Sequence, residues 1–391
     1  MKKLLFFLLL LIPISVFSQN TEIVVKLLDK ENNTPVEGAS ITVLPSKQGL
    51  VSNSEGVFKL FTKKPVRLQI SHASFETLIV NTSSLTEKEN IIYLDRTNKF
   101  LEEVIVTKNH PQEILKKVVK TSIENLTVPV NLKVYTREFF KKNDKYTSFN
   151  DGLLNFCIQG NPKNVKTDIL VEQNRFYGLL NEDFQKKMPL GYNLNDLINN
   201  YYEFRYLNRV IESSARKKYD YEIKTFPGNR DWYMMKIYPL KDVEEYLADF
   251  TIVYDYQKNI IIEIHSAISE ERYDYANTTD FNVVKGKIYH SIFNAVYKYD
   301  GKDYYLSSSN EEIGFSRNTK KKETERIEVK NYFVTTQFDK KMVPYDKDDV
   351  YKDQSLNNKR NSIITNYWEM DSGLTLTDDE RKIIEDLATK L

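Results

Sequence analysis

The chain has one cysteine and four histidines among its 391 residues. Because Cys157 has no second cysteine to pair with, no disulfide can form within the chain, and packed cores must stabilise the fold. Cys157 lies in the apolar run LLNFCIQ, which is typical of a buried strand. Its thiol is therefore expected to be unreactive.

Long apolar stretches and an excess of one charge are also missing. After Ile14 the most apolar stretch, NIIIEIHSAI, is interrupted by Glu263 and His265, whereas a membrane-spanning helix needs about 18 or more apolar residues. The 56 basic and 55 acidic residues nearly cancel, so charge gives no reason to expect nucleic acid as a partner. We expect no transmembrane helix in the mature chain and no nucleic-acid partner.

Common cofactor and nucleophile motifs are absent as well. The sequence contains no Walker loop, no dinucleotide-binding glycine pattern and no nucleophile elbow. These absences predict a chain without cofactors and without a recognisable catalytic centre.

The first residues, MKKLLFFLLLLIPISVFSQN, have the three parts of a secretory signal peptide. Two lysines precede an apolar run that ends at Ile14, and Val16 and Ser18 fit the positions before a cleavage site. No cysteine near that site could accept a lipid. The sequence therefore predicts that residues 1–18 are removed and that the mature chain is exported to the periplasm or the outer-membrane periphery.

Residues 19–97 have the pattern of a small β-sandwich. Seven short apolar runs, from EIVVKLL to NIIYL, are separated by turn signals such as NNTP and NSEG. This spacing is typical of short strands in a sandwich. The 26 tyrosines and 21 phenylalanines of the whole chain also favour a mainly β protein.

The segments PVEGASITV, VSNSEGVFKL and LQISHASFETL make this sandwich more specific. In this order they resemble the carboxypeptidase regulatory-like domain, a transthyretin-like fold abundant in exported proteins of Bacteroidetes-type bacteria. The segment SHASFE departs from the family, which often has Gly-Tyr where this chain has Ser74 and Phe75. The resemblance implies a seven-stranded antiparallel β-sandwich that serves as an accessory interaction module and brings no catalytic residues.

A zinc carboxypeptidase would need a His-x-x-Glu segment and a second histidine on the metal. His110 and Glu113 have this spacing, but Pro111 and Glu113 also fit the first turn of a helix. The other histidines, His72, His265 and His290, have no glutamate at that spacing. We therefore expect no metal site, and we expect the chain not to be an enzyme.

For residues 98–127 the sequence predicts a linker strand followed by an amphipathic helix over 111–125, where apolar residues recur at helical spacing. The strand LEEVIVT is similar to the segment that joins the same sandwich to the plug of outer-membrane nutrient transporters. It could add to the sheet of a partner protein, or it could pack on its own chain.

Residues 128–391 predict a larger α+β domain. Consecutive hairpins, one of which turns at Asp300-Gly301, indicate a large curved antiparallel sheet. A helical insertion is expected over about 193–213 and a C-terminal helix over about 377–391. Thr377 and Glu380 fit a capping box at the start of the latter.

Tyrosines beside polar residues suggest a recognition surface, because their rings are apolar and their hydroxyls form hydrogen bonds. The candidate residues are Tyr201, Tyr202, Tyr273, Tyr275, Tyr304 and Tyr305. They could instead be cross-strand neighbours on a half-buried sheet.

The favoured hypothesis is a non-catalytic, exported cell-envelope binding or scaffold protein. Its partner would be another envelope protein or a glycan, and peripheral association with the outer membrane is one option. The alternative is an envelope lipid or lipoprotein carrier that uses a concave, half-barrel-like sheet. A third hypothesis is an enzyme whose site comes from residues distant in the sequence.

Overall fold

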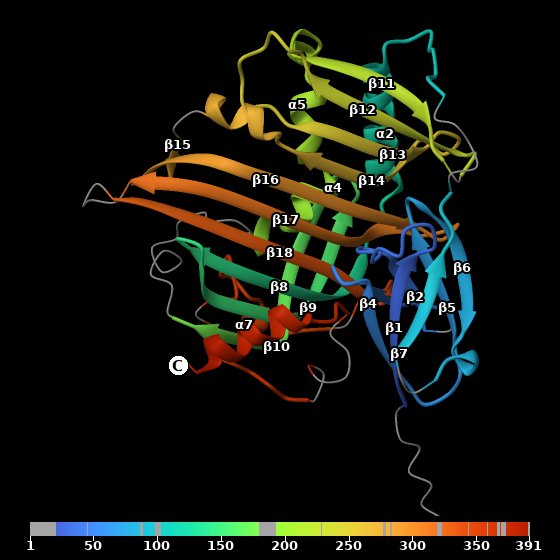
Figure 1. The fold of residues 1–391 in the computed structure, drawn as a ribbon, viewed down its shortest axis with the longest axis vertical. Helices are drawn as coiled ribbons and strands as arrows, with labels where there is room; N and C mark the ends of the chain where they lie inside the picture. The colour runs from blue at the N-terminus through green and yellow to red at the C-terminus, as the bar shows by residue number, and fades with distance from the viewer. Residues whose placement is uncertain are drawn as a thin grey trace, which may run out of the picture.

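The structure is a computed structural model in which a small β-sandwich lies against one large sheet (Figure 1). The predicted signal segment, residues 1–18, lies outside the described residues. The described residues are 21–44, 46–86, 89–97, 103–179, 193–227, 229–276, 279–281, 284–318, 323–342, 344–357, 359–365, 368 and 373–389. The expected fold class, a mainly β chain with a sandwich followed by a large antiparallel sheet, is confirmed.

The sandwich has the expected seven strands. They are β1 (Thr21–Asp29), β2 (Ser40–Val43), β3 (Gln48–Val51), β4 (Val57–Thr62), β5 (Arg67–His72), β6 (Phe75–Asn81) and β7 (Glu89–Leu94). The three-stranded sheet, with strand order β4-β1-β7, faces the four-stranded sheet, with strand order β3-β2-β5-β6. Alternate residues of β1, such as Ile23, Val25 and Leu27, are buried between the two sheets because successive side chains of a strand point to opposite faces.

The prediction of an antiparallel sandwich is wrong for one pair of strands. β1 and β7 pair in parallel, with Val24 opposite Glu89, whereas the other neighbours in the sandwich are antiparallel. No hairpin joins β1 to β7, since β7 follows β6 of the opposite sheet and returns by a crossover. Only a hairpin would have forced the two strands into opposite directions.

We expect the sandwich to fold without the rest of the chain. Its strands enclose a core of their own, which includes Ile41, Leu68 and Ile70. An expressed fragment 19–97 should therefore give a dispersed amide spectrum and a sigmoidal melt. The matched fragment with Ile41→Asp, which buries a charge in this core, should lose both features. An undispersed spectrum from the unmodified fragment would contradict the prediction.

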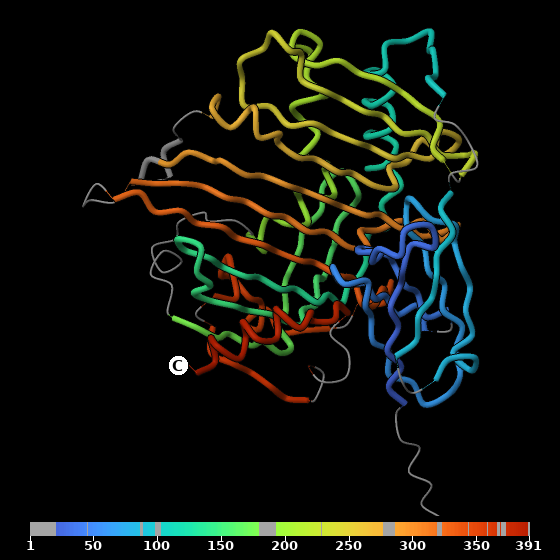
Figure 2. The backbone as a smooth tube through the Cα atoms, in the orientation of Figure 1, coloured from blue at the N-terminus to red at the C-terminus, as the bar shows by residue number. Residues whose placement is uncertain are grey.

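The large sheet is antiparallel throughout. Its strands are β8 (Val130–Lys142), β9 (Lys145–Asn161), β10 (Asn164–Gly178), β11 (Tyr219–Thr225), β12 (Trp232–Pro239), β13 (Asp249–Asp255), β14 (Ile260–Ala267), β15 (Thr279–Phe281), β16 (Val284–Tyr299), β17 (Tyr304–Asn318) and β18 (Thr324–Asp339). The order is β10-β9-β8-β18-β17-β16-β14-β13-β12-β11, with β15 beside β16. Two meanders therefore meet where β8 pairs with β18, as the chain trace shows (Figure 2).

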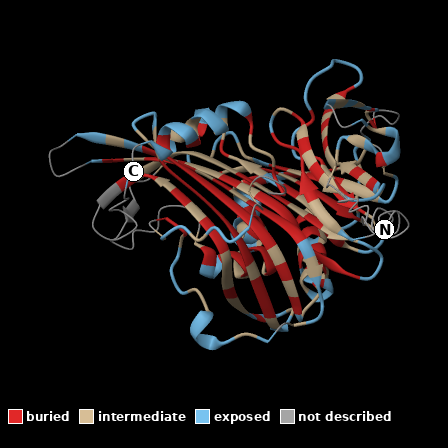
Figure 3. Cartoon of the chain, turned by 90° about the horizontal axis from the view of Figure 1, so that it is seen from below, coloured by how far each residue is buried: buried red, intermediate tan, exposed pale blue. Residues whose placement is uncertain are grey.

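Helices cover one face of this sheet. They are α2 (Pro111–Asn125), α4 (Leu194–Tyr202) and α5 (Asn208–Ile211), with the short 3-10 helices η2 (Arg205–Leu207) and η3 (Ser213–Lys217). Leu115 and Val118 of α2 and Leu197 of α4 belong to the largest core of the chain. Buried residues accordingly run along the curved strands (Figure 3). α2 spans the predicted range, and the expected insertion consists of α4, η2 and α5.

The opposite face of the sheet is covered in part by α7 (Asp378–Ala388) and in part by the sandwich. The predicted capping box is confirmed, because Thr377 and Glu380 bond to each other's backbone N–H groups. Ile384 and Leu387 of α7 pack on β8 and β9. The sandwich approaches so closely that a Cβ at Gly49 of β3 would collide with a backbone carbonyl of β18.

Three further 3-10 helices complete the described elements: η1 (Thr82–Ser84), η4 (Glu270–Tyr275) and η5 (Lys347–Asp349). Within the described ranges, none of the helices has the length and apolar character needed to cross a membrane.

Candidate functional site

A cleft of about 670 Å³ lies between the sandwich and the large sheet. The sandwich contributes one wall from β5 and β6, and the sheet contributes the floor from β14, β16, β17 and β18. The sandwich wall includes Gln69, Ser71 and Phe75, and the floor includes Asn294, Ser308 and Asn310. A volume of this size is within the range of about 300–1,000 Å³ that is usual for small-molecule sites.

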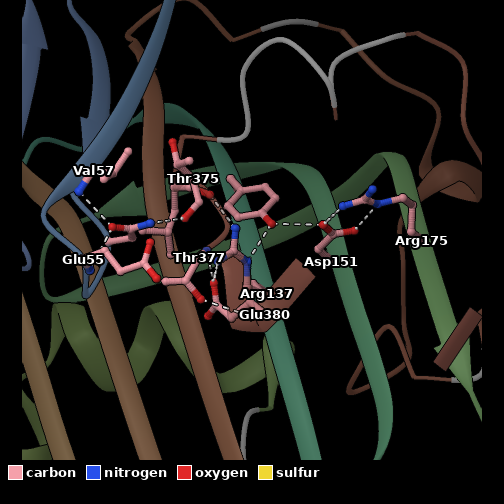
Figure 4. A network of polar contacts seen from close by, with 11 residues as sticks. Glu55, Val57, Arg137, Asp151, Arg175, Thr375, Thr377 and Glu380 are labelled. Carbon is pink, nitrogen blue, oxygen red and sulfur yellow. Dashed lines mark hydrogen bonds and ion pairs between the residues drawn. The ribbon is translucent and has the colours of Figure 1, made fainter. Parts of the chain in front are cut away.

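The segment 373–377 fastens the sandwich to the sheet. The Val51 N–H donates to the Gly373 carbonyl at 2.9 Å, and the Asn53 amide donates to the Thr375 carbonyl at 3.3 Å. The Thr375 hydroxyl accepts from the Lys59 N–H at 3.1 Å. Asn53 is itself fixed, since its side-chain oxygen accepts from two N–H groups of its own turn (Figure 4). Both strands that flank this turn are thereby tied to the C-terminal segment.

Arg137 of β8 lies at the centre of this attachment and is 1 % exposed. Its Nη2 donates to the Leu374 carbonyl, and its Nη1 lies 3.0 Å from the Glu380 carboxylate (Figure 4). Its Nε donates to the Tyr135 hydroxyl at 2.9 Å. One buried guanidinium therefore connects the sheet, the C-terminal segment and the start of α7.

The polar network continues across the neighbouring strands. The Tyr135 hydroxyl donates to Asp151 of β9 at 3.0 Å, and Arg175 of β10 donates to the same carboxylate at 3.0 Å (Figure 4). Buried charges are tolerated only when they are paired and hydrogen-bonded, as these are. The network fixes the rear wall of the cleft rather than presenting free charge to a ligand.

A second charged group lies on the cleft floor. The Glu312 carboxylate is 2.7 Å from Lys330 Nζ and 3.7 Å from His290 Nε2. His290 and Lys330 together lower the pKa of the Glu312 carboxyl to about 2. Glu312 is therefore ionised and already neutralised by its neighbours at neutral pH.

Glu263 of β14 differs from Glu312 and Glu380, the two paired acids of the cleft. Within the described part of the chain, its carboxyl has neither a hydrogen-bond nor an ion-pair partner. Burial raises the pKa of this carboxyl to about 7. Glu263 can therefore be protonated or ionised near neutral pH, so it can donate or accept a hydrogen bond.

Four of the six predicted surface tyrosines are buried, which corrects the prediction for them. Tyr201, Tyr202 and Tyr304 are 0 % exposed and Tyr305 is 7 % exposed. The Tyr201 hydroxyl donates to Glu311 at 3.1 Å, and Tyr305 stacks on Phe338 with ring centroids 4.4 Å apart. All four belong to the largest core cluster, so the alternative of packed neighbours holds for them.

Tyr273 and Tyr275 lie together on η4 and keep part of their surface exposed. They do not line the cleft. Their role in recognition stays a prediction. The cleft residues Phe226, Trp232 and Asn310 were not among the candidates, because nothing in their local sequence indicates that the sandwich faces them.

The described part of the segment LEEVIVT, residues 103–107, pairs with its own chain. The Ile105 N–H donates to the Ile223 carbonyl at 2.8 Å, and the Thr225 N–H donates to the Glu103 carbonyl at 3.0 Å. These bonds occupy part of the outer edge of β11. Of the two alternatives, the linker that pairs within the chain is the one observed.

The His-x-x-Glu segment is the start of a helix, as expected. His110 precedes α2 and its Nδ1 accepts from the Gln112 N–H at 3.1 Å, while Glu113 pairs with Arg216 and Lys116. Among the described residues, no group of three or more histidines, cysteines, aspartates or glutamates could hold a metal ion.

A comparison with protein families agrees with the sandwich geometry. Residues 26–106 match the CarboxypepD_reg-like domain. The match runs from within β1 to the strand that pairs with β11, and the large β-rich region follows it. No curated protein sequence matches the chain. A CarboxypepD_reg-like domain is a non-catalytic type of domain, and no catalytic family is indicated.

We expect Cys157 to resist thiol reagents in the folded protein. The side chain is 1 % exposed in β9, and burial raises the pKa of the thiol to about 11. Because the thiolate is the reactive form, labelling by a maleimide at pH 8 should be slow until denaturant is added. The control is Ser84→Cys on the exposed η1, which should react at once. Fast labelling of folded wild-type protein would contradict this prediction.

Proposed function

We propose that the chain is a non-catalytic, exported cell-envelope binding protein that captures its ligand in the cleft between the CarboxypepD_reg-like domain and the large sheet. The observation that carries the proposal is the Arg137 network, which attaches the sandwich rigidly beside a cleft of ligand size. Because this wall of the cleft is already fixed, less conformational entropy is lost when a ligand binds. The CarboxypepD_reg-like domain would act as the second wall of the site.

The same observations favour this function over the lipid carrier. A carrier needs an open apolar groove, but α2, α4 and α5 fill the apolar face of the sheet with side chains of this chain. The cleft on the other face is lined by hydroxyls, amides and charged groups. An acyl chain would leave those polar groups without hydrogen-bond partners.

The test compares how much ligand is captured from envelope extracts by wild-type protein and by variants in which a larger side chain fills the cleft. Ser71→Tyr fills it from the sandwich and Asn310→Tyr fills it from the sheet. Ser84→Tyr is the matched control, because Ser84 on η1 is exposed and does not line the cleft. Both cleft variants should lose the ligand and still melt like wild type, and the control should retain it. Equal capture by all three would overturn the proposal, as would turnover of the captured ligand.

Export is part of the same proposal. It rests on the charged start, the apolar run and the cleavage pattern of residues 1–18. N-terminal sequencing of protein recovered from the envelope should begin at Gln19. A chain that retains residues 1–18, or that remains in the cytoplasmic fraction, would contradict it.

A further inference from the structure

The floor of the cleft presents polar groups that the chain leaves unused. Asn294 of β16 pairs in register with Asn310 of β17, and Ser308 lies two residues from Asn310 on the same strand face. Among the described residues, the side chains of Ser308 and Asn310 have no hydrogen-bond partner. Only the amide oxygen of Asn294 is engaged, by His265 at 2.5 Å. Hydroxyl and amide groups are thus available to a ligand side by side.

Aromatic rings form the edges of the cleft. Phe226 and Trp232 lie next to each other at the β11–β12 end, with ring centroids 5.7 Å apart. Phe75 lies in the sandwich wall beside His72, with ring centroids 5.2 Å apart. Half-buried aromatic rings beside polar groups suit a ligand that has both apolar faces and hydrogen-bonding groups.

The charges of the cleft largely cancel before any ligand binds. Arg137 is paired with Glu380, and Lys330 is paired with Glu312. Within the ranges that the structure describes, Glu263 has no partner and Lys298 donates only to the Thr42 hydroxyl. Two acids of this lining, Glu263 and the exposed Glu37, and one amine, Lys298, therefore remain without an ion-pair partner, so the described site has no excess of positive charge. A phosphate or another anion is best bound by several cations together, which this lining does not offer.

We propose that the cleft binds a neutral oligosaccharide, with Asn310, Ser308 and Glu263 bonding its hydroxyls and Trp232 packing against the apolar face of a sugar ring. This inference rests on the proposed function, because it names the ligand class of that same cleft. A sugar offers vicinal hydroxyls that both donate and accept, which matches amides, a serine and a carboxyl. The cleft volume of about 670 Å³ is large enough for a short oligosaccharide.

Isothermal titration calorimetry of the full mature chain tests the inference. The probes are trisaccharides of glucose, N-acetylglucosamine, mannose and xylose, and a pool of neutral tetrapeptides serves as the competing class. At least one trisaccharide should bind saturably. Trp232→Ala and Asn310→Ala should each raise its Kd at least about tenfold. Tyr238→Ala is the matched control, because Tyr238 is an exposed aromatic residue on the same strand, β12, and does not line the cleft.

The outcomes separate this inference from the proposed function. If no trisaccharide binds, or if binding is equal in Trp232→Ala, Asn310→Ala and wild type, the carbohydrate assignment is wrong. If tetrapeptides bind instead and Asn310→Tyr removes that binding, the cleft is a binding site of another class, and the proposed function stands without this inference. Thermal melts of each variant must match wild type, so that loss of binding is not loss of folding.

Discussion

Replacing Arg137 by alanine should lower the free energy of unfolding by about 3–5 kcal/mol, the usual cost of breaking a buried ion pair from one side. The substitution removes the cation that is paired with Glu380 and the guanidinium donors to the Leu374 carbonyl and the Tyr135 hydroxyl. It also opens a cavity in a fully buried position. Chemical denaturation of the mature chain measures the effect.

The exposed Arg67 of the sandwich provides the control for Arg137. Arg67→Ala should change the free energy of unfolding by no more than about 0.5 kcal/mol. Glu380→Ala should also be destabilising, and the double variant Arg137→Ala/Glu380→Ala should lose less than the sum of the two. Equal stability of Arg137→Ala and Arg67→Ala would show that the network does not fasten the sandwich to the sheet.

Glu138→Gln should be stabilising at pH 8 and have little effect at pH 5. Glu138 is 4 % exposed on β8 and accepts from the amides of Asn150, at 2.9 Å, and Asn357. Burial raises the pKa of its carboxyl to about 7 despite these bonds. The folded state therefore holds a proton that the unfolded chain releases near pH 4.5.

The sign of the pH effect follows from that difference in proton binding. Stability is highest below the unfolded pKa and falls as the pH rises towards the folded pKa, because the folded state binds more protons in this window. The shift corresponds to about 3 kcal/mol between pH 4.5 and 7, a loss that the uncharged glutamine of the variant would avoid.

Denaturation at pH 5, 6, 7 and 8 measures this, with exposed Glu244→Gln as the control. Glu311 also has a raised pKa because of burial, and it contributes to the wild-type slope but not to the difference between wild type and Glu138→Gln. A difference that stays constant from pH 5 to 8 would contradict the prediction.

The sandwich could be predicted because its signals are local. Turns such as Asn53-Ser54-Glu55-Gly56 are encoded in a few adjacent residues, and so are the caps of α2 and α7. The parallel pairing of β1 with β7 could not be predicted. The chain between these strands passes through the opposite sheet, so no local turn determines their relative direction.

The candidate site was less predictable than the fold. Tyr304 and Tyr305 are adjacent in a strand and point to opposite faces, yet both are buried. The Tyr304 hydroxyl donates to the Ile261 carbonyl at 2.5 Å, and Tyr305 stacks on Phe338 of β18. The cleft depends on the pairing of β18 with β8 and on the hydrogen bonds between the sandwich and the C-terminal segment 373–377. Such distant contacts leave no periodic pattern in a single sequence.

Fluorine NMR of protein labelled with fluorotryptophan tests the central claim, ligand binding in the cleft, most directly. The chain has two tryptophans, of which Trp232 lines the cleft and Trp368 lies over Arg175 in the polar network. Addition of the ligand captured from envelope extracts should shift the Trp232 resonance, assigned with Trp232→Phe, and leave that of Trp368 in place. A captured ligand that shifts neither resonance, or only that of Trp368, would show that binding takes place outside the cleft.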